Sequence, residues 1–227
     1  MDARERMRGT LRTLECGEPA SSLVVVMLHG RNMRAADLAP FGASLGVDAH
    51  FVFPDAPLVA EPGRTWWPVA SEAHLREQGA RDLHAMDPPG RSAARAMLGD
   101  LCDEVAYGKR LALVGFSQGG MLAMDYVLHG GTVDALALLS STRIAFDEWR
   151  PLLPGLSGLP VLVAHGHADA ELSFAAGEAL RDAALAGGAE VTWLPFDGGH
   201  GIPLPVWRGL RRFLMAISRI FSLPLQN

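Results

Sequence analysis

Short, continuous runs of apolar residues recur along the chain and alternate with segments of helical periodicity. The runs cover residues 23–28, 51–53, 111–114, 135–139, 161–164 and 191–194. Continuous rather than alternating apolarity is typical of a strand that helices cover on both faces. The segments between the runs are long enough for right-handed helical crossovers. The pattern therefore predicts an α/β fold with a doubly wound, mostly parallel sheet.

Two segments show clear helical periodicity. Residues 91–105 place four apolar side chains on one face, which predicts a crossover helix that leads into the run at 111–114. Residues 206–221 are apolar but interrupted by arginines, which predicts an amphipathic terminal helix packed on the sheet.

The segment at 58–90 differs from the rest of the chain. It is rich in proline and glycine and has little sustained periodicity, which predicts an irregular excursion over one edge of the sheet. Two interpretations of its second half, residues 70–90, remain open. It is either a partial lid or a surface helix with a modest apolar face.

The composition narrows the class of protein. A chain of 227 residues without a Ser/Gly linker or charge block predicts a single domain over 1–227. Hydrophobic residues make up 49% of it, enough for a large core. The net charge of −5 provides no basic stripe for a phosphate backbone, so a nucleic-acid partner is not expected.

Nothing in the sequence predicts export or membrane insertion. The first apolar run, at 23–28, is too short and too late for a signal peptide, and no stretch is long enough to span a bilayer. Cys16 and Cys102 are too few for a disulfide framework. We expect a cytoplasmic protein with two reduced thiols. The apolar residues 220–225 can cover either their own core or a neighbour, so monomer and homodimer both remain open.

Residues 115–119 read G-x-S-x-G, directly after the apolar run at 111–114 and before a helix-compatible stretch at 121–128. A strand that turns sharply into a helix around a serine exposes the hydroxyl at the carboxyl edge of the sheet. Only glycine tolerates the crowding on either side of such a serine. The motif therefore predicts Ser117 as a nucleophile, with a simple glycine-rich turn as the competing interpretation.

A serine hydroxyl needs an imidazole to take its proton and a carboxylate to orient that imidazole. Asp169 follows the run at 161–164, and His200 follows the run at 191–194. The chain order Ser117, Asp169, His200 is the order found in α/β-hydrolases. These three residues are the predicted catalytic triad.

Other residues compete for these roles. His29 and His165 each precede a glycine at a strand end, where we expect them to order a loop. Asp197 is expected to form a turn close to His200. The remaining histidines, expected on the surface or in packing positions, are His50, His74, His84 and His129. The H-x-H-x-D run at 165–169 is a weak metal signature without a second ligand cluster, so neither a metal nor a cofactor is expected.

At these residues the chain resembles the α/β-hydrolase superfamily and, within it, the carboxylesterase/phospholipase group that includes acyl-protein thioesterases. The resemblance covers most of the chain and rests on the segments 28–30 (L-H-G), 53–57 (F-P-D-A-P), 66–67 (W-W), 115–120 (G-F-S-Q-G-G), 165–169 (H-G-H-A-D) and 199–200 (G-H). It implies Ser117 as nucleophile, His200 as general base and then acid, and Asp169 as the carboxylate that orients it.

The resemblance also implies an oxyanion hole made by the backbone N–H groups of Gln118 and Arg31. Asn32 and Met33 depart from the group's pattern, which often has a glycine and a small or polar residue there. The result is a bulkier loop, although a backbone donor at Arg31 does not depend on its side chain.

Trp66, Trp67 and Met33 are candidates for the wall of a substrate pocket. The alternative for the two tryptophans is that both anchor the excursion to the fold. Arg64 either meets an anionic substrate group or is a solvated loop arginine.

The sequence as a whole predicts a serine carboxylesterase that hydrolyses small to medium acyl esters through an acyl-enzyme, with a small-molecule ester as its substrate. The first alternative is a lysophospholipase or an acyl-thioesterase. Acyl transfer to an alcohol and a non-catalytic binding module are further alternatives. The sequence does not fix the acyl length or separate esters from thioesters.

Overall fold

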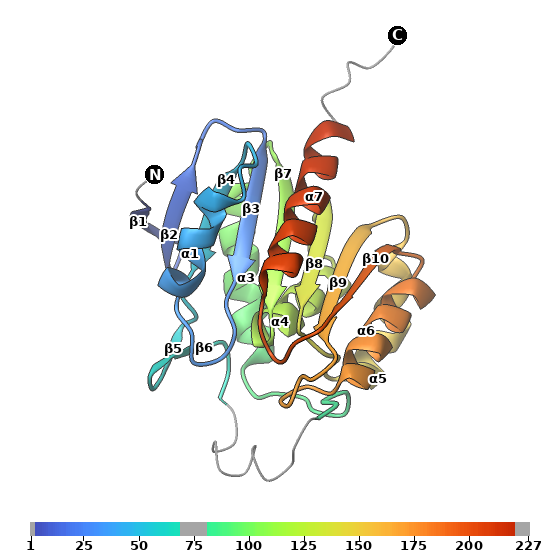
Figure 1. Cartoon of the computed structure of the whole chain (residues 1–227). Helices are drawn as coiled ribbons and strands as arrows, with labels where there is room; N and C mark the ends of the chain where they lie inside the picture. The colour runs from blue at the N-terminus through green and yellow to red at the C-terminus, as the bar shows by residue number, and fades with distance from the viewer. Residues whose placement is uncertain (1–2, 69–80, 221–227) are drawn as a thin grey trace.

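The computed structural model describes residues 3–68 and 81–220, with side chains as far as residue 218. Within these residues the core is an eight-stranded sheet with the order β1-β2-β4-β3-β7-β8-β9-β10 (Figure 1). Its strands are β1 Arg4–Arg8, β2 Leu11–Gly17, β3 Leu23–Leu28, β4 His50–Pro54, β7 Arg110–Phe116, β8 Ala135–Leu139, β9 Pro160–Gly166 and β10 Glu190–Phe196.

Six neighbouring strands are parallel to one another, in the spatial order β4, β3, β7, β8, β9 and β10. Each of them contains one of the predicted apolar runs. Every residue of β3, β4 and β8 is buried, as expected for strands covered on both faces. The prediction of a doubly wound, mostly parallel sheet is confirmed.

β1 and β2 extend the sheet at one edge and were not predicted. β2 pairs with β4 and with β1 in antiparallel fashion. The first half of β2 alternates buried and exposed positions, and β1 is almost entirely exposed. A search for continuous apolar runs misses both strands, because strands with solvent-exposed positions need no continuous apolarity.

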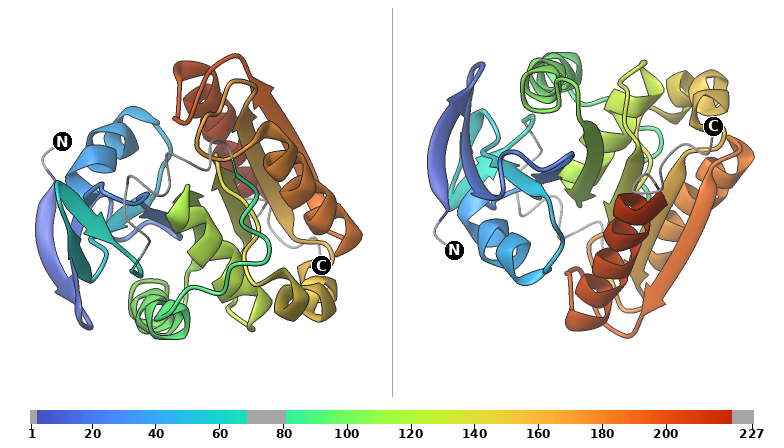
Figure 2. Two further views of the ribbon diagram at one scale, coloured as in Figure 1. Left: turned by 90° about the horizontal axis from the view of Figure 1, so that it is seen from below. Right: turned by 90° about the horizontal axis from the view of Figure 1, so that it is seen from above.

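Helices cover both faces of the sheet. α1 (Ala35–Ser44) and α7 (Leu204–Ile220) lie on one face, and α3 (Arg91–Val105) and α4 (Gln118–Leu128) lie on the other (Figure 2). α6 (Phe174–Ala186) packs into the same core layer as α3 and α4. A short helix α5 (Phe146–Trp149) continues into the 3-10 helix η1 (Arg150–Leu156).

The two predicted helices are present. α3 has the predicted bounds and buries Ala94, Leu98 and Leu101. α7 begins two residues earlier than predicted and buries Val206 and Leu210 against the sheet. None of the helices in the described part of the chain is both long and apolar enough to cross a bilayer.

The excursion at 58–90 begins with a small antiparallel ribbon of β5 (Leu58–Ala60) and β6 (Gly63–Thr65). β6 is joined to the loop after β3, where the backbone N–H of Asn32 donates to the Arg64 carbonyl at 2.9 Å. Residues 69–80 lie outside the described residues. Residues 81–90 form turns and an isolated bridge between Arg81 and Leu172, so the predicted surface helix is wrong for this part. For the rest of 70–90, the lid and the surface helix both stay predictions.

Candidate active site

Ser117 lies in the sharp turn between β7 and α4. Its backbone has a φ of 52° and a ψ of −118°, a conformation that non-glycine residues rarely adopt. The turn is held on both sides: the Ser117 N–H donates to the Leu139 carbonyl at 2.9 Å, and the N–H of Gly120 donates to the Ser117 carbonyl at 3.0 Å. This is the strand-to-helix geometry that the motif predicts.

The glycines of the motif are required by close packing of backbone on backbone. A Cβ atom on Gly115 would lie 2.4 Å from the Gly119 carbonyl oxygen. A Cβ on Gly119 would lie 2.5 Å from the carbonyl oxygen of Leu28, at the end of β3. No side chain fits at either position, because α4 starts directly against the two central strands.

The structure brings together the three residues of the predicted triad. His200 Nε2 lies 3.0 Å from Ser117 Oγ, and His200 Nδ1 lies 2.8 Å from Asp169 Oδ2. The residues come from the loops after β7, β9 and β10, at the edge of the sheet where the chain enters α7 (Figure 1). Parallel strands place their carboxyl ends at the same edge, which is why residues so far apart in sequence meet.

Asp169 is 5% exposed and is fixed by several donors. Its Oδ1 accepts from the backbone N–H groups of Glu171 and Leu172 at 2.9 Å each, and His165 Nε2 lies 3.3 Å from its Oδ2. Burial alone would raise the pKa of Asp169, but the hydrogen bonds from His165 and His200 outweigh burial and hold the pKa well below its usual range. The side chain is therefore a carboxylate at neutral pH.

The two histidines that compete with His200 for the role of general base, His29 and His165, are buried and bonded to the backbone. His29 Nδ1 donates to the Gly30 carbonyl at 2.7 Å, while its Nε2 accepts from the Ala56 backbone N–H at 3.0 Å. Only a neutral ring can make both bonds, and burial lowers the pKa of His29 accordingly. His165 is fully buried, with its Nε2 3.0 Å from the Leu172 carbonyl.

Asp197, the other carboxylate considered for the triad, points to a different residue. Its side chain is exposed and lies 3.2 Å from His167 Nδ1. The 2.8 Å contact with His200 Nδ1 belongs to Asp169.

Gln118 opens α4, and helix-opening N–H groups have no acceptor within their own helix. Its buried side chain turns away to the excursion: Oε1 accepts from the Trp66 backbone N–H at 3.0 Å, and Nε2 lies 3.4 Å from the Trp67 carbonyl. Sequence reasoning missed this contact, because no local pattern links positions 52 residues apart. Arg31 lies in the loop after β3, beside Asn32, which has a φ of 62°.

Both tryptophans of the excursion are 1% exposed and belong to the hydrophobic core. Trp66 Nε1 donates to the His29 carbonyl at 2.9 Å, which ties the excursion to the loop after β3. Met33 is partly buried and packs on the core of the opposite face. These contacts anchor the excursion to the loop after β3 and to the core. A role in a pocket wall stays a prediction for all three residues.

Arg64 makes a structural contact that neither of its two predicted roles includes, and a contact with an anionic substrate group stays a prediction. Its guanidinium donates to the backbone carbonyls of Ala56 and Pro57, the latter at 2.9 Å. The side chain therefore braces the chain after β4 and is not simply solvated.

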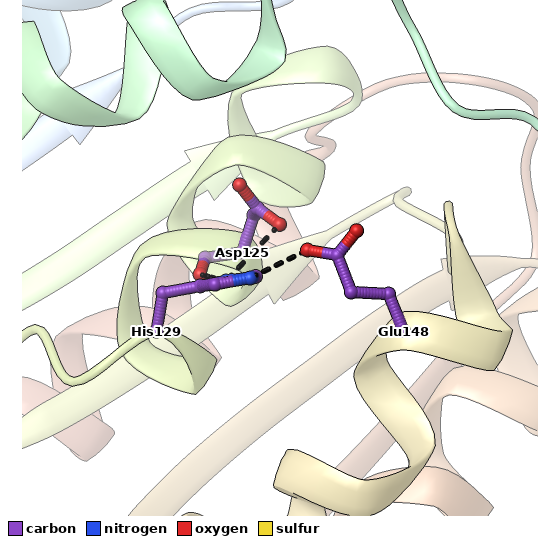
Figure 3. Close-up of side chains that lie close together, drawn as sticks. All are labelled: Asp125, His129 and Glu148. Atoms are coloured by element: carbon purple, nitrogen blue, oxygen red, sulfur yellow. Dashed lines mark hydrogen bonds and ion pairs between the residues drawn. The ribbon is translucent and has the colours of Figure 1, made fainter.

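A second group of ionisable side chains lies two turns along α4 from Ser117. Asp125, His129 and Glu148 place potential ligand atoms within 4.8 Å of one another (Figure 3). Asp125 is fully buried, however, and already pairs with Arg91 and with Arg95 Nη1, the latter at 2.8 Å. Cations of the protein itself thus occupy the site, and the group is an ion-pair network between α3, α4 and α5.

Two open cavities, of about 680 and 650 Å³, lie at the other edge of the sheet. Both are lined by residues of the segment that leads into β8, namely Gly130, Gly131, Thr132 and Asp134. No member of the triad lines either cavity. Ligands of open α/β sheets bind at the carboxyl ends of the strands, so neither cavity belongs to the chemistry of the triad.

No protein-family model matches this chain, and no curated protein matches its sequence. Solved structures do match it over nearly its full length. Esterase PE8 is 24% identical, with a TM-score of 0.74, over 96% of this chain and 100% of its own. A carboxylesterase from Mesorhizobium loti is 20% identical, with a TM-score of 0.75, over 94% and 99%. Acyl-protein thioesterase 2 from Zea mays is 20% identical, with a TM-score of 0.76, over 91% and 99%. At these identities the similarity shows a shared fold.

Proposed function

We propose that this chain, which has the α/β-hydrolase fold, is a serine carboxylesterase that hydrolyses small to medium acyl esters through an acyl-enzyme intermediate. The observation that carries the proposal is the continuous contact from Ser117 Oγ through His200 to Asp169, at 3.0 and 2.8 Å. The solved structures of similar fold include proteins named as carboxylesterases, which supports the same class of reaction.

In the first half-reaction, Ser117 Oγ attacks the ester carbonyl carbon and its proton passes to His200 Nε2. Asp169 accepts the Nδ1–H of the ring, which keeps Nε2 facing the serine and stabilises the imidazolium that forms. The carbonyl oxygen becomes an oxyanion in the tetrahedral intermediate. The backbone N–H groups of Gln118 and Arg31 are the proposed donors to that oxyanion.

Collapse of the intermediate breaks the bond to the alcohol oxygen, which takes the proton from His200 Nε2 and leaves. In the second half-reaction a water molecule gives its proton to His200 and attacks the acyl-serine. The carboxylic acid is released, and Ser117 regains its proton. The same chemistry would serve a lysophospholipase or a thioesterase, and an acceptor alcohol in place of water would make the protein an acyltransferase.

The test is hydrolysis of p-nitrophenyl esters of increasing acyl length by wild type and by Ser117→Ala. We expect the substitution to lower kcat by about 10⁴-fold or more, because the nucleophile and its general base act as a unit. Ser44→Ala, at the exposed end of α1, is the matched control and should retain the wild-type rate. Wild-type activity in Ser117→Ala would rule out the mechanism.

Parallel assays with thioesters of the preferred acyl group decide between an esterase and a thioesterase. Product analysis with an added alcohol separates hydrolysis from acyl transfer, since a transferase forms mostly new ester even in a large excess of water.

A further inference from the structure

The loop after β9 places a second carboxylate beside the reacting atoms. Glu171 Oε2 lies 4.0 Å from His200 Nε2, the same nitrogen that contacts Ser117 Oγ. The backbone of Glu171 is held on both sides: its N–H donates to Asp169 Oδ1 at 2.9 Å, and its carbonyl accepts from the Arg81 N–H at 3.1 Å. The loop therefore fixes the backbone position from which this carboxylate reaches the triad.

The Glu171 carboxylate is available to a ligand. Its side chain is 52% exposed, and among the described residues the one basic side chain that contacts the carboxylate is His200, which is neutral when it serves as the general base. Arg81 Nε lies 3.3 Å from the Glu171 backbone carbonyl rather than pairing with the carboxylate. The other carboxylates nearby are engaged elsewhere, Asp169 with His200 and Asp197 with His167.

The position of Glu171 determines which part of an ester it meets. The leaving alcohol takes its proton from His200 Nε2 and must lie within hydrogen-bond reach of that nitrogen. Glu171 stands next to the same nitrogen, whereas the proposed oxyanion donors Gln118 and Arg31 belong to the loops after β7 and β3. A negative charge at Glu171 therefore faces the alcohol portion of the substrate and not its carbonyl oxygen.

We propose that Glu171 determines specificity for the alcohol portion: it favours esters of cationic alcohols, with an ammonium group a few bonds from the ester oxygen, and disfavours anionic leaving groups. The inference rests on the proposed esterase function. It predicts poor turnover of leaving groups that carry phosphate close to the ester or thioester.

The expected preference follows from the Coulomb interaction of two unit charges at a partly exposed site. At a separation of about 6 Å and an effective dielectric constant of about 40, it amounts to a factor of about ten in kcat/KM. Salt screens charges at exposed sites, so the preference should shrink as the ionic strength rises.

The experiment compares two esters of the same acid, a choline ester and its uncharged 3,3-dimethylbutyl isostere, with the acyl chain that the p-nitrophenyl series selects. We expect wild type to prefer the choline ester by about tenfold in kcat/KM. Glu171→Gln should bring this ratio close to one, and any effect common to both esters cancels in the ratio. Asp197→Asn, which removes an exposed carboxylate on the neighbouring loop, should keep the wild-type ratio.

Inhibition by the free alcohols provides a second readout. Choline should inhibit wild type more strongly than 3,3-dimethylbutanol does, and Glu171→Gln should remove the difference. A ratio near one in wild type, or one that Glu171→Gln leaves unchanged, would overturn the inference while the esterase function stands. Failure of wild type to hydrolyse any ester would overturn the proposed function, and this inference with it.

Discussion

The pKa values of the buried carboxylates Glu15 and Asp169 are set by the hydrogen-bond donors around them. Glu15, in strand β2, accepts from Arg8 Nε at 2.7 Å, His50 Nε2 at 3.0 Å and Thr13 Oγ1 at 3.0 Å. Burial raises the pKa of Glu15, but the hydrogen bonds from His50 and Arg8 outweigh burial and lower it to about 2. Asp169 shows the same balance in the triad. The hydrogen-bond donors to Glu15 and Asp169 differ, but in both cases hydrogen bonds lower the pKa by more than burial raises it.

The low pKa of Glu15 makes stability depend on pH. Its folded pKa of about 2 lies below its ordinary value of 4.5, so the unfolded chain binds the proton first. The contribution to the free energy of unfolding is complete above the ordinary value and is lost as the pH falls towards 2. Denaturant titrations at stepwise lower pH should show a steeper loss for wild type than for Glu15→Gln. Glu190→Gln, at an exposed position, should follow wild type, and parallel curves for wild type and Glu15→Gln would refute the prediction.

At the scale of elements, the approach of α4 to the sheet is set by glycine. A Cβ on Gly119 would collide with the carbonyl oxygens of Leu28 and His29, at 2.5 and 2.7 Å. A Cβ on Gly99, within α3, would meet only Tyr126 Cε2, at an ordinary 3.6 Å. The two helical glycines therefore differ in purpose: one permits a contact between elements, and the other only weakens its helix.

This difference predicts that replacing glycine by alanine has opposite effects on the free energy of unfolding at the two positions. Gly119→Ala must push α4 away from β3, which should lower the free energy of unfolding by about 3 kcal/mol and displace Ser117, with a large loss of esterase rate. Gly99→Ala should raise the free energy of unfolding by about 0.5–1 kcal/mol, because alanine favours the helix. Chemical denaturation of both variants is the measurement. Equal effects in the two would contradict the packing argument.

At the scale of the whole molecule, one buried charge joins elements that are separate in sequence. Asp125 of α4 is fully buried and accepts from Arg95 Nη1 and Trp149 Nε1, at 2.8 Å each. It also forms an ion pair with Arg91, and Arg91 Nη2 lies 2.7 Å from Glu148 Oε2. The network ties α3, α4 and α5 into one layer over the sheet, and Figure 3 shows the part of it formed by Asp125, His129 and Glu148.

Removing the charge of Asp125 should destabilise the layer of α3, α4 and α5 and leave the catalytic triad in place. Asp125→Asn removes the fully buried negative charge between the guanidinium groups of Arg91 and Arg95, and Arg91 keeps only its contacts with the more exposed Glu148 and Asp87. We expect a loss of about 3 kcal/mol in the free energy of unfolding. Asp147→Asn, which breaks an exposed pair with Arg150, should cost less than about 1 kcal/mol. Thermal and denaturant unfolding compare the two. A loss in Asp125→Asn no larger than in Asp147→Asn would show that the network contributes little.

The sequence by itself determined those features that follow from local pattern. Five of the six parallel strands are visible as apolar runs because they are buried on both faces, and α3 is visible because its period matches one buried face. The sixth, β10, lies at the end of the sheet and contains an apolar run although it is only partly buried. The motif around Ser117 is visible in the sequence as well, although only Gly115 is required by crowding within the turn, whereas Gly119 is required by the approach of α4 to β3. The single domain, the cytoplasmic location and the oligomeric state remain predictions.

Only the tertiary structure decided which residues meet across loops. The contact of Gln118 with Trp66, the place of Glu171 beside His200 and the cations around Asp125 join distant parts of the chain. The antiparallel strands β1 and β2 are likewise defined by their pairing rather than by apolarity. Hydrophobic periodicity reports burial on an element's own faces, whereas the choice of partner depends on how loops from several strands converge at one edge of the sheet.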